Sequence, residues 1–245
     1  HYDAVVVNTS IIMIIYVCMV IVSRHKEVHF IAHAHNTGVV LNKGALRNKF
    51  VPFMHTLDNI LRTSIRKKSF SLFSCSAEAG ETTFGKDAIH MDKFKIVRNA
   101  IDLYKFRFKK ETADEVRQEM SVNGKTLVIG NVGKLSKRKN QFFLIQIFLT
   151  IHRQYPDSQL WLIGDGEDKD MLADVVRETG LQNDVVFLGE KKDVHRYFYA
   201  MNAFVFTTLS EGFGIVAVEA QAAGLPTVVS DGVPDDVLLT PLAVK

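Results

Sequence analysis

The chain has 245 residues, of which 47% are hydrophobic and 23% are charged, so it can form one large folded domain or two small ones and is not a disordered chain. Its net charge of +3 comes from 30 basic and 27 acidic side chains, a balance that argues against nucleic acid as the main partner. The two cysteines, Cys18 and Cys75, match no metal or redox spacing, and we interpret them as reduced thiols.

The N-terminal part predicts a strand, a helix and a second strand. Residues 2–7 predict a buried strand, Thr9 or Ser10 is expected to cap a helix that ends near Arg24, and residues 28–32 predict another strand. The apolar run at residues 11–22 would be only ~18 Å long as a helix, against about 30 Å of bilayer hydrocarbon, so we predict a buried helix. This order is typical of a parallel crossover unit within a covered sheet.

The second strand leads into the sequence Ala-His-Ala-His-Asn-Thr-Gly at residues 32–38. Ligands of open α/β sheets bind beyond the carboxyl ends of the strands, so His33 and His35 are candidates for a polar contact or a base toward a substrate. A metal site is disfavoured, because no third ligand follows at a supporting spacing.

Basic residues then alternate with apolar ones between residues 40 and 70. This segment fits either a solvated face or a basic amphipathic surface on anionic lipid, and the sequence leaves both open. Its basic residues are Lys43, Arg47, Lys49, Arg62, Arg66, Lys67 and Lys68. Residues 69–74 predict a short strand. Residues 80–87 have the glycine and lysine spacing of a phosphate loop, but Asp87 stands where a hydroxyl would hold magnesium, and we reject that interpretation.

Residues 95–102 predict a strand and a turn, and a charged stretch through Glu119 follows. This change of composition suggests a domain junction, which we place between residues 108 and 109. Beyond residue 125 strands and helices alternate, as in a doubly wound parallel sheet. The predicted strands are 126–131, 159–163, 185–188, 203–206 and 227–230, and the predicted helices are 142–153, 169–179 and 194–201.

The stretch from Glu211 to Glu219 follows the predicted strand 203–206. Glycines at 212 and 214 predict a turn, and residues 215–223 predict a helix that ends at Gly224. A helix N-terminus after such a turn suits a phosphate. The two glutamates are expected to lie on roughly one side if the helix extends that far, and carboxylates beside a phosphate site are better suited to binding hydroxyls. Together they predict a sugar-nucleotide site.

A second phosphate signal is the loop at residues 133–140, which carries Lys134, Lys137, Arg138 and Lys139 after the first strand of the second sheet. Together with the helix N-terminus at Gly214, these cations can surround a diphosphate. A solvated loop before a helix explains the same residues equally well when the loop is taken alone.

These features together resemble the retaining glycosyltransferases of family four, especially those of bacterial capsular and exopolysaccharide synthesis. The resemblance extends over nearly the whole chain and implies the GT-B fold, an α/β architecture with two Rossmann-like domains whose parallel sheets are flanked by helices. It further implies an incomplete acceptor-side domain at residues 1–108 and a donor-binding domain at 109–245. The matching segments are Glu211–Glu219, Gln221–Pro226, Gly133–Asn140, Leu162–Gly166, Phe187–Gly189, Asn99–Asp102 and His33–Thr37.

The resemblance also assigns roles at the site. It implies that Glu219 binds the ribose hydroxyls, that Glu211 faces the transferred sugar, and that Lys139 binds the diphosphate. Lys134 stands where many members have arginine. Lysine keeps the positive charge but cannot make the bidentate contact of arginine to a phosphate. His35, with His33 as second choice, would face the reacting sugar, so the expected catalytic residues are His35, Glu211 and Lys139. The expected donor-binding residues are Lys134, Lys139, Phe213, Gly214, Ile215 and Glu219.

The implied reaction is retaining transfer from a nucleoside diphosphate sugar, expected to be a UDP-sugar, to a saccharide or lipid-linked acceptor, with no cofactor or metal required. We expect a cytoplasmic bacterial protein, with a peripheral contact at the inner face of the membrane. Relatives are longer at both ends, so weak activity at best is expected of these 245 residues. Two alternatives remain: a non-catalytic nucleotide-sugar-binding or partner subunit, and a sugar-nucleotide epimerase on the same fold.

Overall fold

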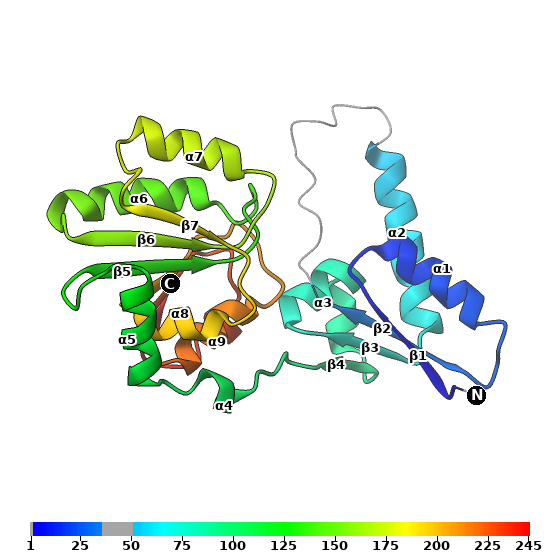
Figure 1. The fold of residues 1–245 in the computed structure, drawn as a ribbon. Coiled ribbons are helices and arrows are strands. Elements are labelled where there is room, and N and C mark those ends of the chain that lie inside the picture. The colour runs from blue at the N-terminus through cyan, green and yellow to red at the C-terminus, as the bar shows by residue number, and fades with distance from the viewer. Residues whose placement is uncertain (1, 36–50) are drawn as a thin grey trace. The chain divides into compact units, whose positions relative to one another are not determined.

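The structure is a computed structural model that describes residues 2–35 and 51–245, with side chains from residue 56 onward in the second range. The chain forms two compact units. Unit 1 comprises the residues up to Asn99 together with Glu211–Phe213, and unit 2 comprises Ala100–Ser210 and Gly214–Lys245. Each unit contains a parallel sheet flanked by helices, so the predicted α/β class is confirmed (Figure 1). The predicted junction after residue 108 falls within unit 2 and stays a prediction.

Unit 1 has a four-stranded parallel sheet with the order β1-β2-β3-β4. The strands are β1 (Ala4–Asn8), β2 (His29–Ala34), β3 (Ser71–Ser74) and β4 (Phe94–Ile96). The helices are α1 (Ile12–Val22), α2 (Val51–Lys68), α3 (Ala77–Phe84) and the 3₁₀ helix η1 (Lys86–His90). All of them contribute to one core with Phe30, Ala32 and Leu72, so they cover the same face of the sheet.

Helix α1 differs from its prediction in two ways. Its N-cap is Ile11, because the Thr9 hydroxyl accepts from the amide of Ile11 and the Ser10 hydroxyl accepts from the amide of His35 at the end of β2. The prediction of a buried helix is also wrong. Only Ile15 and Met19 are buried, since the sheet covers one stripe of a helix that is apolar all round. Exposed apolar side chains occupy the other side: Met13, Ile14, Val17, Val20 and Ile21.

The rejected phosphate-loop motif lies partly inside a helix. Gly80 is in the middle of α3, whose N-cap hydroxyl, Ser76 Oγ, accepts a hydrogen bond from the amide of Ala79. A phosphate loop instead requires glycines in the turn that precedes a helix. The rejection therefore agrees with the structure. Within the described ranges, the helices are too short or too polar for any of them to cross a membrane.

Unit 2 has a six-stranded parallel sheet with the order β10-β9-β8-β5-β6-β7, which confirms the doubly wound prediction. The strands are β5 (Leu127–Val132), β6 (Ser158–Ile163), β7 (Val185–Gly189), β8 (Ala203–Phe206), β9 (Thr227–Val229) and β10 (Ala243–Val244). The helices are α4 (Leu103–Phe106), α5 (Lys110–Glu119), α6 (Gln141–Gln154), α7 (Lys169–Glu178), α8 (Val194–Ala200), α9 (Ile215–Ala222) and the 3₁₀ helix η2 (Asp235–Val237).

Helices cover both faces of the unit 2 sheet (Figure 1). On one face α6 and α7 enclose a core with Leu160 and Leu162 of β6. On the other face Trp161 contacts Tyr197 of α8 edge to face, and Phe198 of α8 contacts Phe204 of β8. Strands buried on both sides are nearly continuously apolar, which is why their positions could be predicted. This packing fixes the carboxyl ends of β5, β6 and β8, from which the predicted donor-binding loops of unit 2 start.

Candidate functional site

The loop after β5 is held at the carboxyl edge of the unit 2 sheet by backbone hydrogen bonds to β6 and the loop that follows it. The amide of Gly133 donates to Ile163 O at 2.9 Å, and the amide of Leu135 donates to Asp165 O at 3.0 Å. Gly133 and Gly164 approach so closely that a Cβ on Gly164 would clash with the backbone of Gly133. Both have positive φ angles, so glycine is required for this approach. The basic loop is therefore built into the sheet edge.

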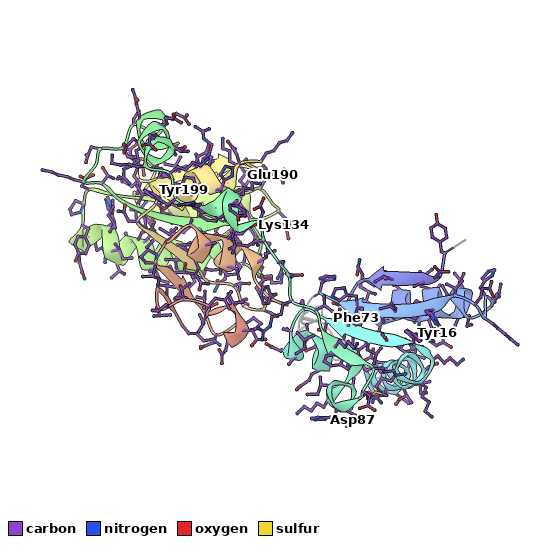
Figure 2. All side chains as sticks on the ribbon, turned by 90° about the horizontal axis from the view of Figure 1, so that it is seen from below. Tyr16, Phe73, Asp87, Lys134, Glu190 and Tyr199 are labelled. Atoms are coloured by element: carbon purple, nitrogen blue, oxygen red, sulfur yellow. The ribbon has the colours of Figure 1, made fainter. Side chains whose placement is uncertain are left out.

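Three of the four predicted cations have defined partners inside unit 2, and one of them is Arg138, whose guanidinium donates to Ser210 O at 2.9 Å. Lys134, labelled in Figure 2, pairs with Glu167 at 2.7 Å between Nζ and Oε2, and this hydrogen bond lowers the pKa of Glu167. Lys139 places its ammonium 4.5 Å from the ring centroid of Phe206 on β8. A cation over an aromatic face keeps its charge and loses part of its freedom. Lys139 is thus oriented before any ligand binds.

Lys137, in the same loop, lines a hollow of about 330 Å³ near the N-terminus of α6. Asp168, Phe142, Met171 and Leu209 line the same hollow, and the predicted donor-binding residues are not part of its lining. The sequence predicts one group of four cations around a diphosphate, whereas in the structure Lys137 lines a hollow that the predicted donor-binding residues do not line. We therefore leave Lys137 out of the candidate site.

The loop after β8 is tied to the basic loop by hydrogen bonds that join residues far apart in the sequence. Thr207 Oγ1 donates to Asn140 O at 3.0 Å, and Thr208 Oγ1 donates to Arg138 O at 3.1 Å. The amide of Leu209 donates to the same carbonyl of Arg138 at 2.8 Å. The sequence analysis missed these threonines, although two hydroxyl residues directly after an apolar strand were a visible signal. They bring the cations beside the segment that leads to α9.

Helix α9 begins at Ile215, one residue after Gly214, as predicted. Gly214 has φ 82° and does not cap the helix with a side chain. The amide of Ala217 donates to Gly214 O at 2.9 Å, and the amides that precede it in the first turn are the groups that a helix N-terminus offers to a ligand. Glu211 lies before the helix, so the helix does not extend far enough for Glu211 and Glu219 to share one side of it. Glu211 is 8% exposed and belongs to unit 1, whereas Glu219 lies on α9 in unit 2.

Glu219 is half-buried, and burial raises the pKa of its carboxyl group while the positive charge of Lys105 opposes that rise. A buried carboxyl group is costly to ionise unless charge or hydrogen bonds compensate it. Among the residues that the structure describes, the carboxyl group of Glu219 has no hydrogen-bond or ion-pair partner. It can therefore accept hydrogen bonds from ligand hydroxyls.

The predicted histidines lie together in unit 1. The ring centroids of His33 and His35 are 4.0 Å apart, and His33 also contacts Phe73 of β3 edge to face at 6.0 Å. Burial and the neighbouring His35 lower the pKa of His33, so its imidazole is neutral near pH 7. The thiol of Cys75 donates to His35 O at 3.3 Å, and Ser76 Oγ donates to Gly212 O at 2.7 Å. Asn36 and Thr37 lie outside the described residues.

Metal ligands do not cluster in the part of the chain that the structure describes: groups of three or more His, Cys, Asp or Glu side chains with suitable geometry are absent from it. The candidate site of unit 2 consists instead of cations, helix amides and one half-buried carboxyl group. This chemistry suits a phosphate-bearing ligand with neighbouring hydroxyls.

Comparison with known proteins identifies relatives of this chain. The sequence profile of the family Glycosyl transferases group 1 matches residues 112–235. EpsF of Bacillus subtilis is 31% identical over 178 residues, which are 73% of this chain and 46% of EpsF. The Escherichia coli UDP-Gal:alpha-D-GlcNAc-diphosphoundecaprenol alpha-1,3-galactosyltransferase is 26% identical over 227 residues, with 84% of this chain and 59% of the relative covered.

Solved structures share the fold. The Anabaena protein Alr3699/HepE in complex with UDP and glucose has a TM-score of 0.77 at 21% identity, covering 98% of this chain and 62% of that protein. Sucrose-phosphate synthase from Thermosynechococcus elongatus has a TM-score of 0.77 at 19% identity, covering 98% and 59%. The likeness confirms the predicted GT-B type of fold. The chain spans about half the length of the curated relatives it matches.

Proposed function

Because the chain belongs to the family Glycosyl transferases group 1, we propose that the protein transfers a sugar, with retention of configuration, from a nucleoside diphosphate sugar to a saccharide or lipid-linked acceptor in polysaccharide synthesis. A UDP-sugar is the proposed donor. The observation that carries the proposal is the preformed anion site of unit 2, where Lys134, Lys139 and the N-terminus of α9 follow neighbouring strands of one sheet.

Each group of this site has a proposed task. Lys134 and Lys139 neutralise the diphosphate, and the amides at Gly214 and Ile215 orient it, so that charge is stabilised as the nucleoside diphosphate departs. Glu219 accepts hydrogen bonds from the ribose hydroxyls. In unit 1, Glu211, Phe213 and His35 are proposed to face the transferred sugar, with His33 supporting His35. Cations and amides can stabilise the leaving group directly, so we propose that no metal or other cofactor is needed.

Two relatives support UDP as the nucleotide. One is by name a UDP-galactose-dependent transferase whose acceptor is a diphosphoundecaprenol-linked sugar, and the other was crystallised with UDP and glucose. The name of the first relative also supports a lipid-linked acceptor. These are properties of the relatives, and for this chain they are proposals to be tested.

The donor site is tested by titrating UDP into the protein in a calorimeter. We expect saturable binding that Glu219→Ala weakens by about tenfold or more, because a ribose contact to a charged group is lost. Glu178→Ala, which removes a carboxylate at the end of α7, is the control and should leave binding unchanged. Binding that is absent in the wild type, or insensitive to Glu219→Ala, would contradict the donor site.

The reaction class is tested with UDP-glucose and UDP-galactose. A transferase releases UDP from one of these donors in the presence of its acceptor, whereas an epimerase interconverts the two donors without releasing UDP. Binding of UDP with no release from any donor and acceptor tested would favour the alternative of a binding or partner subunit. Retention is checked by proton NMR of the product, in which an α-linked donor sugar must give an α-linkage.

A membrane contact is proposed for the outer surface of α1 and α2 in unit 1. Arg62 and Arg66 of the predicted basic segment are engaged with the backbone of α3 through Thr82 O and Phe84 O, whereas Lys67 and Lys68 are exposed. Helix α1 packs against α2, so the proposed surface combines the exposed apolar stripe of α1 with these lysines of α2, a composition that suits an anionic bilayer.

Co-sedimentation with vesicles tests this contact. We expect binding to vesicles that contain phosphatidylglycerol, little binding to pure phosphatidylcholine, and a loss in Lys67→Glu/Lys68→Glu. Lys125→Glu, in unit 2, serves as the charge control. Equal binding to both vesicle types, or no binding to either, would contradict an electrostatic contact of this surface with the membrane.

A further inference from the structure

A four-residue helix, α4, is anchored firmly in unit 2 although much of its surface is exposed. The carboxylate of Asp102 caps it by accepting from the amide of Tyr104 at 3.0 Å. Phe106 is 6% exposed and contacts the rings of His195 and Phe198 on α8. Tyr199, labelled in Figure 2, donates its hydroxyl to Lys105 O at 2.8 Å. These contacts fix the backbone from which the Lys105 side chain starts.

The position of Lys105 matters because α4 packs against α9, which carries Glu219. The positive charge of Lys105 counteracts the rise that burial causes in the pKa of Glu219. Among the other elements packed on α9, β8 and β9 carry no charged side chains, η2 carries Asp235 and Asp236, and α8 carries His195 and Arg196. Of these charged groups, Lys105 is the one whose charge shifts the pKa of Glu219.

We propose that Lys105 is a positioning residue of the donor site, whose ammonium keeps the half-buried carboxyl group of Glu219 ionised and ready to bind a vicinal diol. This inference rests on the proposed function and adds a residue from outside the predicted motifs. A carboxylate accepts hydrogen bonds from both hydroxyls of a diol, whereas a protonated carboxyl group carries a donor of its own and can leave one hydroxyl without an acceptor. Lys105 therefore acts on the nucleotide through Glu219.

The test measures UDP affinity by calorimetry from pH 5 to pH 8 in the full chain. Lys105→Met should make Glu219 easier to protonate, so that affinity begins to fall at a higher pH than in the wild type. We expect a loss of about two- to fivefold near pH 5.5 and little change at pH 8, and the loss should shrink in 0.5 M salt. Lys105→Arg should restore the wild-type profile.

Two matched variants separate this effect from others. Lys109→Met removes a cation that, like Lys105, lowers the pKa of His195 but does not act on Glu219, and its pH profile should match that of the wild type. Glu219→Gln should bind UDP weakly with no titration of its own in this range, and adding Lys105→Met to it should cause no further loss. Thermal melts confirm that each variant is folded.

The outcomes distinguish the inference from the proposed function. If the wild type binds UDP through Glu219 and Lys105→Met has an unchanged pH profile, the inference is wrong and the donor site stands. A loss of equal size at every pH would mean that Lys105 contacts the ligand directly, which also overturns the inference. If the wild type does not bind UDP at all, the proposed function itself fails. In that case the carboxyl ¹³C shift of Glu219 still reports whether Lys105 affects its ionisation.

Discussion

The two units of this protein are built from the same strand and helix alternation, but they bury their apolar residues to very different extents. In unit 2, helices cover both faces of the sheet, and Trp161, Leu160 and Phe204 are 0% exposed. In unit 1 the helices cover one face. On the other face Val6 is 48% exposed and His33 and Phe73 are only half-buried.

This contrast shows where a preorganised site can form. In unit 2, threonine hydroxyls and backbone amides hold the predicted donor loops at the ends of strands that are packed on both faces. The positions of Lys139 and of the N-terminus of α9 are therefore fixed before a ligand binds. Unit 1 offers a histidine pair at the end of β2 and leaves α1 with a long exposed apolar stripe. We expect substitutions to have their largest effects in unit 2.

The largest effect should come from the unit 2 core. Trp161→Ala deletes a fully buried ring that contacts Tyr197, and we expect a loss of about 3–5 kcal/mol in the free energy of unfolding of unit 2. Ile14→Ala is the matched truncation on α1 of unit 1, where the side chain is 45% exposed, and should cost less than about 1 kcal/mol. Urea unfolding followed by circular dichroism measures both. Equal losses would contradict the difference between the units.

An intermediate effect is expected at the hydrogen bonds between the loops. Thr208→Val keeps the shape of the side chain but leaves Arg138 O without the donor at 3.1 Å, at an expected cost of about 1–2 kcal/mol in unfolding free energy. UDP affinity should fall as well, because the basic loop loses its support. Thr150→Val on α6, whose exposed hydroxyl donates to Gln146 O, is the control and should change neither quantity.

Each unit contains a histidine whose pKa is lowered by burial, His33 in unit 1 and His195 in unit 2. A lowered pKa in the folded state means that the neutral form is favoured, so this contribution to stability is complete above pH ~6.5 and is lost as the pH falls through the folded-state value. Melting temperatures measured between pH 5 and pH 8 should therefore fall on the acid side of this range. His33→Phe should reduce the pH dependence of the melting temperature of unit 1, and His195→Phe should reduce that of unit 2. If a substitution in one unit reduced the pH dependence of the other unit's melting temperature, the two units would not unfold separately.

The sequence predicted the architecture of unit 2 well because its signals are local. A strand at 203–206 and a helix starting at Ile215 follow from an apolar run, two glycines and a periodic segment, and the structure has both at these positions. Burial of α1 could not be predicted, because a helix that is apolar on all sides carries no period that indicates which stripe faces the core. Thr9 and Ser10 were good cap candidates by type, yet both hydroxyls have other partners.

Individual residues of the candidate site could be named from the sequence, but the contacts between them could not. Lys134, Lys139 and Glu219 were named from local patterns, whereas the contacts that organise them join residues far apart in the sequence. The bond from Tyr199 to the carbonyl of Lys105 spans 94 positions, and that from Thr208 to the carbonyl of Arg138 spans 70. Such contacts depend on the order of strands in the sheet, which one sequence does not specify. For the same reason Glu167 was not recognised as the partner of Lys134.

That ion pair gives the smallest predicted effect and the finest test of the donor site. Before a diphosphate can use the ammonium of Lys134, it must compete with the carboxylate of Glu167, which lies 2.7 Å away. Glu167→Gln should therefore raise UDP affinity by about two- to fivefold, since an exposed pair is worth no more than about 1 kcal/mol. The gain should be absent for uridine, which has no phosphate, and should disappear when Lys134→Met is added.

Asp174→Asn is the matched control, because it breaks a pair of similar length and exposure, with Arg177 at 2.8 Å, on α7. This variant should leave UDP affinity unchanged. If Glu167→Gln strengthened uridine binding as much as UDP binding, the pair would act on the shape of the loop and not on phosphate charge. Lys134 would then lose its assignment to the diphosphate, and Lys139, with its ammonium fixed over Phe206, would be the remaining side-chain cation assigned to that role.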